Sequence, residues 1–283
     1  AYTLKMIKEA GYKSAATAIG ELIDNSLQAE AENIDILVIN KKQRVGARSS
    51  NNVFKLAVLD DGHGMDEDGL HNAMRYGAQI REDLASLGKF GLGLKTASSS
   101  VCLKYSLISR TNLSSPLYKL TWDLEHVSDV NNWEMVDEPV SVDEQEVFEE
   151  LCGNSGTLVV WSRCDRLLSK VYEEPGGTKE QAAIRYIRNK LIEHCALIFH
   201  KYLNPSETGY RTIKIIVNGI EVEYWNPFYP ECSEQVLPVK LTVLPIQRED
   251  GTIHNATVKA WILPHTKDMS KEDNKKFARI SNR

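Results

Sequence analysis

The sequence predicts an α+β protein, in which helices and strands follow one another without the strict alternation of a doubly wound sheet. The chain has 283 residues, which suits one large or two ordinary domains at roughly 100–200 residues each. Its apolar fraction of 42% and charged fraction of 26% are typical of globular proteins and exclude disordered and fibrous classes. Apolar residues recur with helical spacing in some segments and with strand spacing in others.

The first elements are a helix and a hairpin. The apolar residues of 14–30 fall on one stripe at helical spacing, which predicts an amphipathic helix. Strand-like sequence follows at 33–40 and 53–59, and the basic, polar stretch 41–52 between them is typical of a hairpin loop. Residues 66–76 suit a short helix with acidic residues in its first turn.

The middle of the chain predicts a long loop and more strands. Residues 77–94 contain several glycines and little periodicity, so a loop is expected there. Further strands are expected within 101–124 and at 155–163, separated by the acidic stretch 137–150.

The part of the chain after the break at 173–177 is expected to begin with one long helix. A break at 173–177 precedes Thr178, which forms the pattern of a capping box with Gln181 and begins a helix through Ile198. After it we expect strands at 212–217 and 221–225, a second break at 226–230, strand-like sequence at 239–246 and 255–263, and a polar, basic tail at 265–283.

Composition and net charge limit the cellular compartment and the binding partners that are expected for this protein. The net charge of −5 means that any nucleic-acid contact requires a local basic patch. The five cysteines form no CxxC pair, which argues for reduced thiols and against a disulfide frame or a zinc site. No apolar run approaches the ~18 residues of a membrane span. The chain begins without Met and without a signal-peptide layout, which predicts part of a longer intracellular protein, cytoplasmic or, in a eukaryote, nuclear.

The first candidate site lies on the predicted helix at 14–30. Glu21 and Asn25 are four residues apart and therefore share one helix face, away from the apolar stripe. A carboxylate beside a carboxamide can activate a water and hold a hard cation through oxygen. The simple alternative is a solvated polar face.

A second candidate follows the strand at 53–59. The carboxylate of Asp60, held at a strand end, can accept a hydrogen bond from an exocyclic amine, and Gly62 and Gly64 let backbone approach a flat ring. The simple alternative is an Asp-Gly turn, and His63 is best explained as a solvent-facing turn residue.

A third candidate is the glycine run before the helix that contains Lys95. Backbone N–H groups of Gly88, Gly91 and Gly93 at a helix N-terminus form a phosphate cradle. The spacing is the reverse of the Rossmann fingerprint, and Leu94 interrupts the Gly-Lys pair of a P-loop, so both of those motifs fail. A fourth segment, Ser155-Gly156-Thr157, heads a strand and is uninformative alone.

The order and separation of these four segments resemble the GHKL ATPase superfamily: gyrase B, the ninety-kilodalton heat-shock chaperone, histidine kinases and MutL. The likeness covers roughly residues 10–225. It implies the Bergerat fold, a mixed sheet backed by helices, with ATP and Mg²⁺ as cofactors and a loop lid over the nucleotide.

The resemblance implies a role for each residue. Glu21 is the general base that orients the attacking water, and Asn25 coordinates Mg²⁺. Asp60 binds the adenine amino group, supported by Thr157 through an ordered water. Gly62 and Gly64 let the ring approach, Met65 packs on its face, Gly88, Gly91 and Gly93 form the phosphate loop, and Lys95 contacts a phosphate.

Two stretches are similar to microrchidia (MORC) ATPases and their bacterial relatives, namely residues 11–14 (GYKS) and 217–228 (VNGIEVEYWNPF). This predicts an ATPase domain at 1–225 and the beginning of a ribosomal-S5-like transducer at 226–283, with 258–264 as one of its strands. Asn226 stands where an Asp is usual, and Gln28 departs from the usual Asp.

Three functions follow from the resemblance. The first is a slow, Mg²⁺-dependent ATPase whose lid closure and homodimerisation drive a clamp. The second is an ATP-binding scaffold with little turnover. The third, a histidine-kinase catalytic domain, is disfavoured because Glu21 stands where such kinases usually carry Asn and because His194 lacks an acceptor context.

Nucleic acid is a further partner that the resemblance suggests. Basic residues that offer a contact are Lys41, Lys42, Arg44, Arg48, Lys267, Lys271, Lys275, Lys276, Arg279 and Arg283. Solvated loops are the simple alternative, and no membrane contact is expected.

Overall fold

The computed structural model describes residues 11–12, 14–45, 49–76, 93–168, 177–236, 243–247 and 251–281. The chain divides into two compact units, Ala1–Tyr224 and Trp225–Arg283. The predicted ATPase domain at 1–225 and the ribosomal-S5-like transducer at 226–283 stay predictions.

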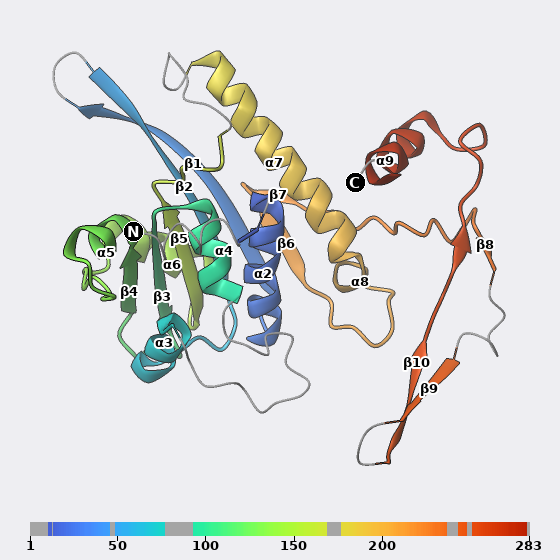
Figure 1. The fold of residues 1–283 in the computed structure, drawn as a ribbon, viewed down its shortest axis with the longest axis horizontal. Coiled ribbons are helices and arrows are strands. Elements are labelled where there is room, and N and C mark those ends of the chain that lie inside the picture. Colours follow the sequence, from blue (N-terminus) through green and yellow to red (C-terminus); the bar gives the residue numbers. More distant parts are fainter. Residues whose placement is uncertain are drawn as a thin grey trace. The chain divides into compact units, whose positions relative to one another are not determined.

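The first unit is built on a mixed sheet (Figure 1). In the described part of the chain its seven strands lie in the order β4-β3-β5-β2-β1-β6-β7. Neighbouring strands are antiparallel except β1 and β6, which are parallel. The strands are β1 (Asn33–Val45), β2 (Ser49–Asp60), β3 (Lys104–Arg110), β4 (Tyr118–Asp123), β5 (Gly156–Ser162), β6 (Lys214–Val217) and β7 (Ile220–Glu221).

Helices cover both faces of this sheet. On one face lie α2 (Ala15–Gln28), α4 (Gly93–Val101) and α7 (Thr178–Ile198), and Figure 1 shows them in front of the strands. The Trp161 indole N–H of β5 donates to Ser98 Oγ of α4 at 2.8 Å on this face. On the opposite face, Phe148 of α6 (Val142–Leu151) packs with Leu158 and Val160 of β5. The mixed sheet with helices confirms the predicted fold class.

Shorter helices complete the first unit: α3 (Glu67–Met74), α5 (Leu124–Val130) and α8 (His200–Leu203). Among the residues described, none of the helices has the length and hydrophobicity needed to cross a membrane.

Helix α2 forms because local and tertiary preferences agree. Ser14 caps its N-terminus by accepting a hydrogen bond from the Thr17 N–H at 3.2 Å. The predicted apolar stripe is buried against the sheet and α4, including Ile19, Leu22 and Ile23. The helix expected at 14–30 is thereby confirmed, with ends at Ala15 and Gln28.

The hairpin is longer than predicted (Figure 1). The stretch 41–52, expected as a loop, is paired from Lys41–Val53 to Val45–Ser49, so that expectation was wrong. The polar side chains of this stretch lack the apolar alternation that predicts a strand. The strands nevertheless pair, because their hydrogen bonds connect backbone groups and do not require apolar side chains.

The capping box predicted at Thr178 was also wrong. The N-cap of α7 is Gly177, which has no side chain to accept a hydrogen bond. A capping box instead opens α6, where Ser141 and Glu144 satisfy each other's backbone N–H groups. The acidic stretch 137–150 therefore contains a helix that hydrophobic periodicity did not reveal.

The described residues of the second unit form two strand pairs and a helix. The strands β8 (Glu234–Gln235), β9 (Val243–Gln247), β10 (Ile253–Thr257) and β11 (Trp261–Ile262) pair as β9 with β10 and β8 with β11. The tail expected as merely polar and basic forms α9 (Lys271–Ser281). Phe277 of α9 packs edge-on against Trp225 and Tyr229 at centroid distances of 5.2 and 5.7 Å.

Gly20 of α2 offers a stability test. A Cβ at this buried helical position would meet His194 Nε2 at 3.8 Å, an ordinary contact. Because glycine weakens a helix by about 0.5–1 kcal/mol relative to alanine, we expect Gly20→Ala to raise the free energy of unfolding by that amount. Urea denaturation measures it. Gly219→Ala is the control: its Cβ has open space but its φ is +77°, so it should destabilise.

Candidate functional site

Asp60 is a buried, fixed hydrogen-bond acceptor. It ends β2 opposite Thr157 of β5 and is 7% exposed. Ser26 Oγ of α2 donates to Asp60 Oδ2 at 2.8 Å, and the Gly62 N–H donates to Oδ1 at 3.1 Å. Burial raises the pKa of Asp60 to about 6, and these two hydrogen bonds act in the opposite direction. The carboxylate therefore keeps a defined orientation with lone pairs left for a ligand.

The loop after Asp60 is held against β3. The Met65 N–H donates to Ser109 Oγ at 2.8 Å. Gly64 has φ +66°, and a Cβ there would lie 1.9 Å from the Arg110 carbonyl oxygen. Only glycine fits this contact, which brings the loop onto the end of the sheet.

Ser109 connects this loop to the head of β5. Its Oγ donates to the Gly156 carbonyl at 2.6 Å and lies 3.2 Å from Thr157 Oγ1. The structure thus brings together Asp60, Met65 and Thr157 at one end of the sheet, with the two predicted glycines, Gly62 and Gly64, in the connecting loop.

Sequence reasoning missed two contributors here. Ser26 is a polar residue within the apolar stripe of α2, which is the signal that could have singled it out as a buried hydrogen-bond donor. Gly156 has φ +145°, and a Cβ would lie 2.0 Å from the Asp60 carbonyl oxygen. The Gly156-Thr157 pair heads a predicted strand, but the sequence does not show the close approach of β2 to it.

Glu21 and Asn25 lie on α2, the helix that also supplies Ser26. Asn25 is exposed, and Glu21 Oε2 lies 2.7 Å from the place that a Cβ on Gly93 would occupy. The Glu21 carboxylate therefore adjoins the first residue of α4. Burial and then the negative charge of Glu21 raise the pKa of Asp24, in the same turn, to about 6.

Three further predicted site residues are Gly88, Gly91 and Lys95. Gly88 and Gly91 lie outside the described residues. Lys95 is fully buried; its Nζ donates to the Ala73 carbonyl at 2.9 Å and lies 5.9 Å from the centroid of the Tyr76 ring. In this structure the Lys95 ammonium group is directed toward α3, so the predicted phosphate contact would require it to leave Ala73.

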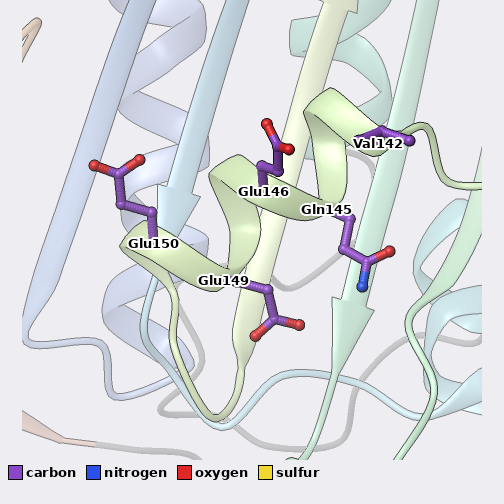
Figure 2. Close-up of a pocket in the computed structure, with 5 residues that line it drawn as sticks. All are labelled: Val142, Gln145, Glu146, Glu149 and Glu150. Atoms are coloured by element: carbon purple, nitrogen blue, oxygen red, sulfur yellow. The ribbon is translucent and has the colours of Figure 1, made fainter.

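A separate hollow lies on α6 (Figure 2). Val142, Gln145, Glu146, Glu149 and Glu150 line it. All five belong to one helix, on the face of the sheet opposite α2 and α4. It contains none of the predicted site residues.

Oxygen donors suitable for Mg²⁺ are present on α2. Asn25 offers a carboxamide oxygen and Glu21 a carboxylate one turn away. In the part of the chain that the structure covers, no group of three or more His, Cys, Asp or Glu is arranged to hold a metal ion. Magnesium is commonly bound by one or two side chains together with substrate phosphates and water, and this donor set fits that pattern.

Comparison with known proteins identifies the fold family. The family described as "Histidine kinase-, DNA gyrase B-, and HSP90-like ATPase" matches residues 12–157, more than half of the chain. Protein MICRORCHIDIA 3 of Arabidopsis thaliana is 37% identical over 84 residues, which cover 30% of this chain and 14% of that protein. ATPase MORC2B of Mus musculus and ATPase MORC2 of Homo sapiens are each 30% identical over 95 residues, 33% of this chain and 9% of theirs.

The chain spans only 9–14% of the length of these relatives. The family match encloses the segments that carry Glu21, Asn25, Asp60 and Gly93 and ends at Thr157. The family is one of ATP-binding domains, and the relatives are MORC proteins. The chain is similar to these MORC proteins over part of its length, and it belongs to the histidine kinase-, DNA gyrase B- and HSP90-like (GHKL) ATPase family.

Proposed function

We propose that this domain binds Mg²⁺–ATP and hydrolyses it slowly to ADP and phosphate. One observation carries the proposal: α2 supplies both the hydroxyl that orients Asp60 and, on its exposed side, Glu21 beside the start of α4. The single helix α2 thus connects a site suited to adenine with a site suited to phosphates.

The Asp60 end would bind adenine. The Asp60 carboxylate accepts the exocyclic amine, and Thr157, its partner across the β2–β5 pair, supports it through a water. Backbone without side chains at Gly62 and Gly64 leaves room for a flat ring, on which Met65 packs. Support comes from the buried acceptor and from its network with Ser26 and Ser109.

The α4 end would bind the phosphates. The backbone N–H groups in the first turn of α4 attract anions, because they lack partners within the helix. Asn25 would hold Mg²⁺, which neutralises charge that develops on the phosphate oxygens during transfer. Gly88, Gly91 and Gly93 would complete the phosphate loop.

Glu21 would act on the attacking water. Its carboxylate accepts a proton from the water as the oxygen approaches the γ-phosphorus, and the N-terminus of α4 stabilises the phosphate oxygens. The position of Glu21 Oε2 next to Gly93 supports this role, because it places the base beside the phosphate-binding turn.

We extend the proposal to a conformational cycle. Binding of ATP would close residues 77–94 over the nucleotide and favour a homodimer, and hydrolysis would reverse both steps, as in a clamp. A nucleic-acid contact through the basic residues stays a prediction, and its binding constant should fall steeply with salt.

An ATP-binding scaffold with little turnover is the second candidate. The observation that favours it is the Lys95 ammonium group, which is directed to Ala73 rather than available for a phosphate. Binding and hydrolysis must therefore be measured separately.

The test combines titration calorimetry with phosphate release. We expect ATP to bind more tightly than GTP, and phosphate release to require Mg²⁺ and to saturate with ATP. Binding without release would favour the scaffold. Absence of ATP binding at millimolar concentration would refute the proposal.

A further inference from the structure

We infer that Arg110 is a positioning residue for the proposed adenine site. Its guanidinium fixes the turn at 153–155, and this turn fixes the loop after Asp60. The inference rests on the proposed function of that site. Arg110 and its partner Glu149 lie outside the four segments used to recognise the nucleotide site.

The guanidinium of Arg110, at the end of β3, forms hydrogen bonds with a helix and with a turn. Its Nη1 and Nη2 donate to Oε1 and Oε2 of Glu149 on α6, both at 2.7 Å. Nε donates to the Asn154 carbonyl at 3.2 Å, and Nη2 also donates to the Gly153 carbonyl. The Arg110 side chain is only 7% exposed, so water competes little for these bonds. The guanidinium therefore ties the turn between α6 and β5 to both α6 and β3.

Ser155, the next residue of this turn, contacts the loop after Asp60. Its Oγ donates to the Gly62 carbonyl at 2.9 Å. The Gly62 N–H in turn donates to Asp60 Oδ1 at 3.1 Å. A short series of hydrogen bonds therefore runs from Arg110 through the turn to the carboxylate that would accept the adenine amine.

The backbone of Arg110 contacts the same loop. Arg110 pairs with Gly156 in the β3–β5 ladder, and its carbonyl oxygen lies 1.9 Å from the place that a Cβ on Gly64 would occupy. Arg110 thus meets the loop after Asp60 through its backbone at Gly64 and through its side chain by way of Ser155.

A guanidinium suits this role chemically. It is planar, so it can donate to a carboxylate through two parallel N–H groups and still donate to neighbouring carbonyls. A lysine ammonium is a compact charge and cannot reproduce that set of contacts. In Arg110→Lys the carbonyls of Gly153 and Asn154 would lose donors, and the turn would gain freedom.

Arg110→Lys is therefore expected to weaken adenine binding and to leave the chemical step unchanged. We expect the Kd for ATP and for adenosine to rise roughly tenfold, within the range usual for coupling between two sites. The kcat at saturating ATP should change by less than about twofold, because Glu21 lies beside α4 and not in this turn. The inhibition constant of Mg²⁺–tripolyphosphate, which lacks adenine, should also change by less than about twofold.

Arg163→Lys is the matched control for the same chemical change. Arg163 follows β5 at the end opposite Gly156 and forms ion pairs with Asp123 and Glu125. Its replacement should alter neither the binding constants, measured by titration calorimetry, nor kcat and the inhibition constant, measured by phosphate release.

Ser155→Ala tests the series of hydrogen bonds at a second point. The half-buried hydroxyl is the link between the turn and Gly62, so its removal should raise the Kd for ATP as Arg110→Lys does. The double variant should bind ATP no more weakly than the weaker single variant, because both changes break one series. If Arg110→Lys does not fold, Ser155→Ala decides the question alone.

The outcomes separate the inference from the proposed function. Equal Kd values for wild type, Ser155→Ala and Arg110→Lys, or fully additive losses in the double variant, would overturn the role of Arg110 and leave the proposed function intact. Parallel losses of kcat and tripolyphosphate inhibition would also overturn it, because they indicate a general structural role. If the wild type bound no ATP, the proposed function would fail, and the inference with it.

Discussion

Replacing Glu21 with Gln is expected to reduce ATP turnover by about 10²–10⁴-fold, the usual contribution of a general base. Glutamine has almost the same shape, so the contact with Gly93 at the start of α4 is retained. Its amide cannot accept a proton at neutral pH, so the water loses the group that activates it. Single-turnover phosphate release measures the effect.

The same variant should retain ATP. The adenine site is formed by Asp60 with its donors Ser26 and Gly62, whereas Glu21 lies beside the start of α4. Glu146→Gln is the matched control, because Glu146 is exposed on α6 on the far face of the sheet (Figure 2). Undiminished turnover after Glu21→Ala or Glu21→Gln would exclude Glu21 as the base.

Replacing Asp60 with Asn is expected to weaken ATP binding by roughly five- to 150-fold, because an unmet hydrogen bond at a buried site costs roughly 1–3 kcal/mol. Three donors would meet at this side chain: the Ser26 hydroxyl, the Gly62 N–H and the adenine amine. A carboxylate offers two acceptor oxygens, whereas asparagine offers one oxygen and an NH₂ group. With an NH₂ group in place of Oδ2, the Ser26 hydroxyl would have to accept instead of donate, and one carboxamide oxygen would have to serve both the Gly62 N–H and the adenine amine. Titration calorimetry measures the change, and Asp129→Asn on α5 is a matched control.

The pKa of Asp60, raised by burial to about 6, adds a pH dependence to this prediction. Below pH 6 the carboxyl is protonated and accepts the amine less well, so ATP affinity should fall as the pH drops from 7.5 to 5.5. Adenosine should show the same decline, which excludes titration of the phosphates as its cause. Without ligand, the effect of pH on the free energy of unfolding has the opposite sign. The folded state holds the Asp60 proton more tightly than the unfolded state, so the contribution of Asp60 to stability decreases as the pH rises from about 4 to 6. An ATP affinity independent of pH in this range would contradict the proposed role.

Part of the candidate site follows from local sequence patterns, and part depends on contacts between distant segments. The spacing of Glu21 and Asn25 on α2 follows from the helical period alone, and the structure places both on that helix. The contact between Ser26 and Asp60 joins residues 34 positions apart, and that between Ser109 and Thr157 joins residues 48 apart. Such pairs depend on which strands become neighbours in the sheet. The roles assigned to these residues stay predictions until the variants above are measured.

The errors in the predicted fold also arise because local patterns do not specify which segments become neighbours. Residues 41–45 and 49–52 belong to the hairpin because their backbone groups pair although the side chains are polar. Lys95 is buried because the face of α4 on which it lies packs toward α3 and Tyr76, and its phosphate contact stays a prediction. The sequence pattern does not specify which face of a short helix will be covered.

By itself, the sequence determined the class of the protein, its helix α2 and the order of the four segments, because these depend on composition, periodicity and spacing along the chain. Only the tertiary structure decided that Ser26 and Gly62 orient Asp60 and that Gly156 must lack a side chain. The physical reason is that each of these contacts requires two distant segments to approach within a few ångströms. That approach is set by how the helices and strands pack together, which no local pattern contains.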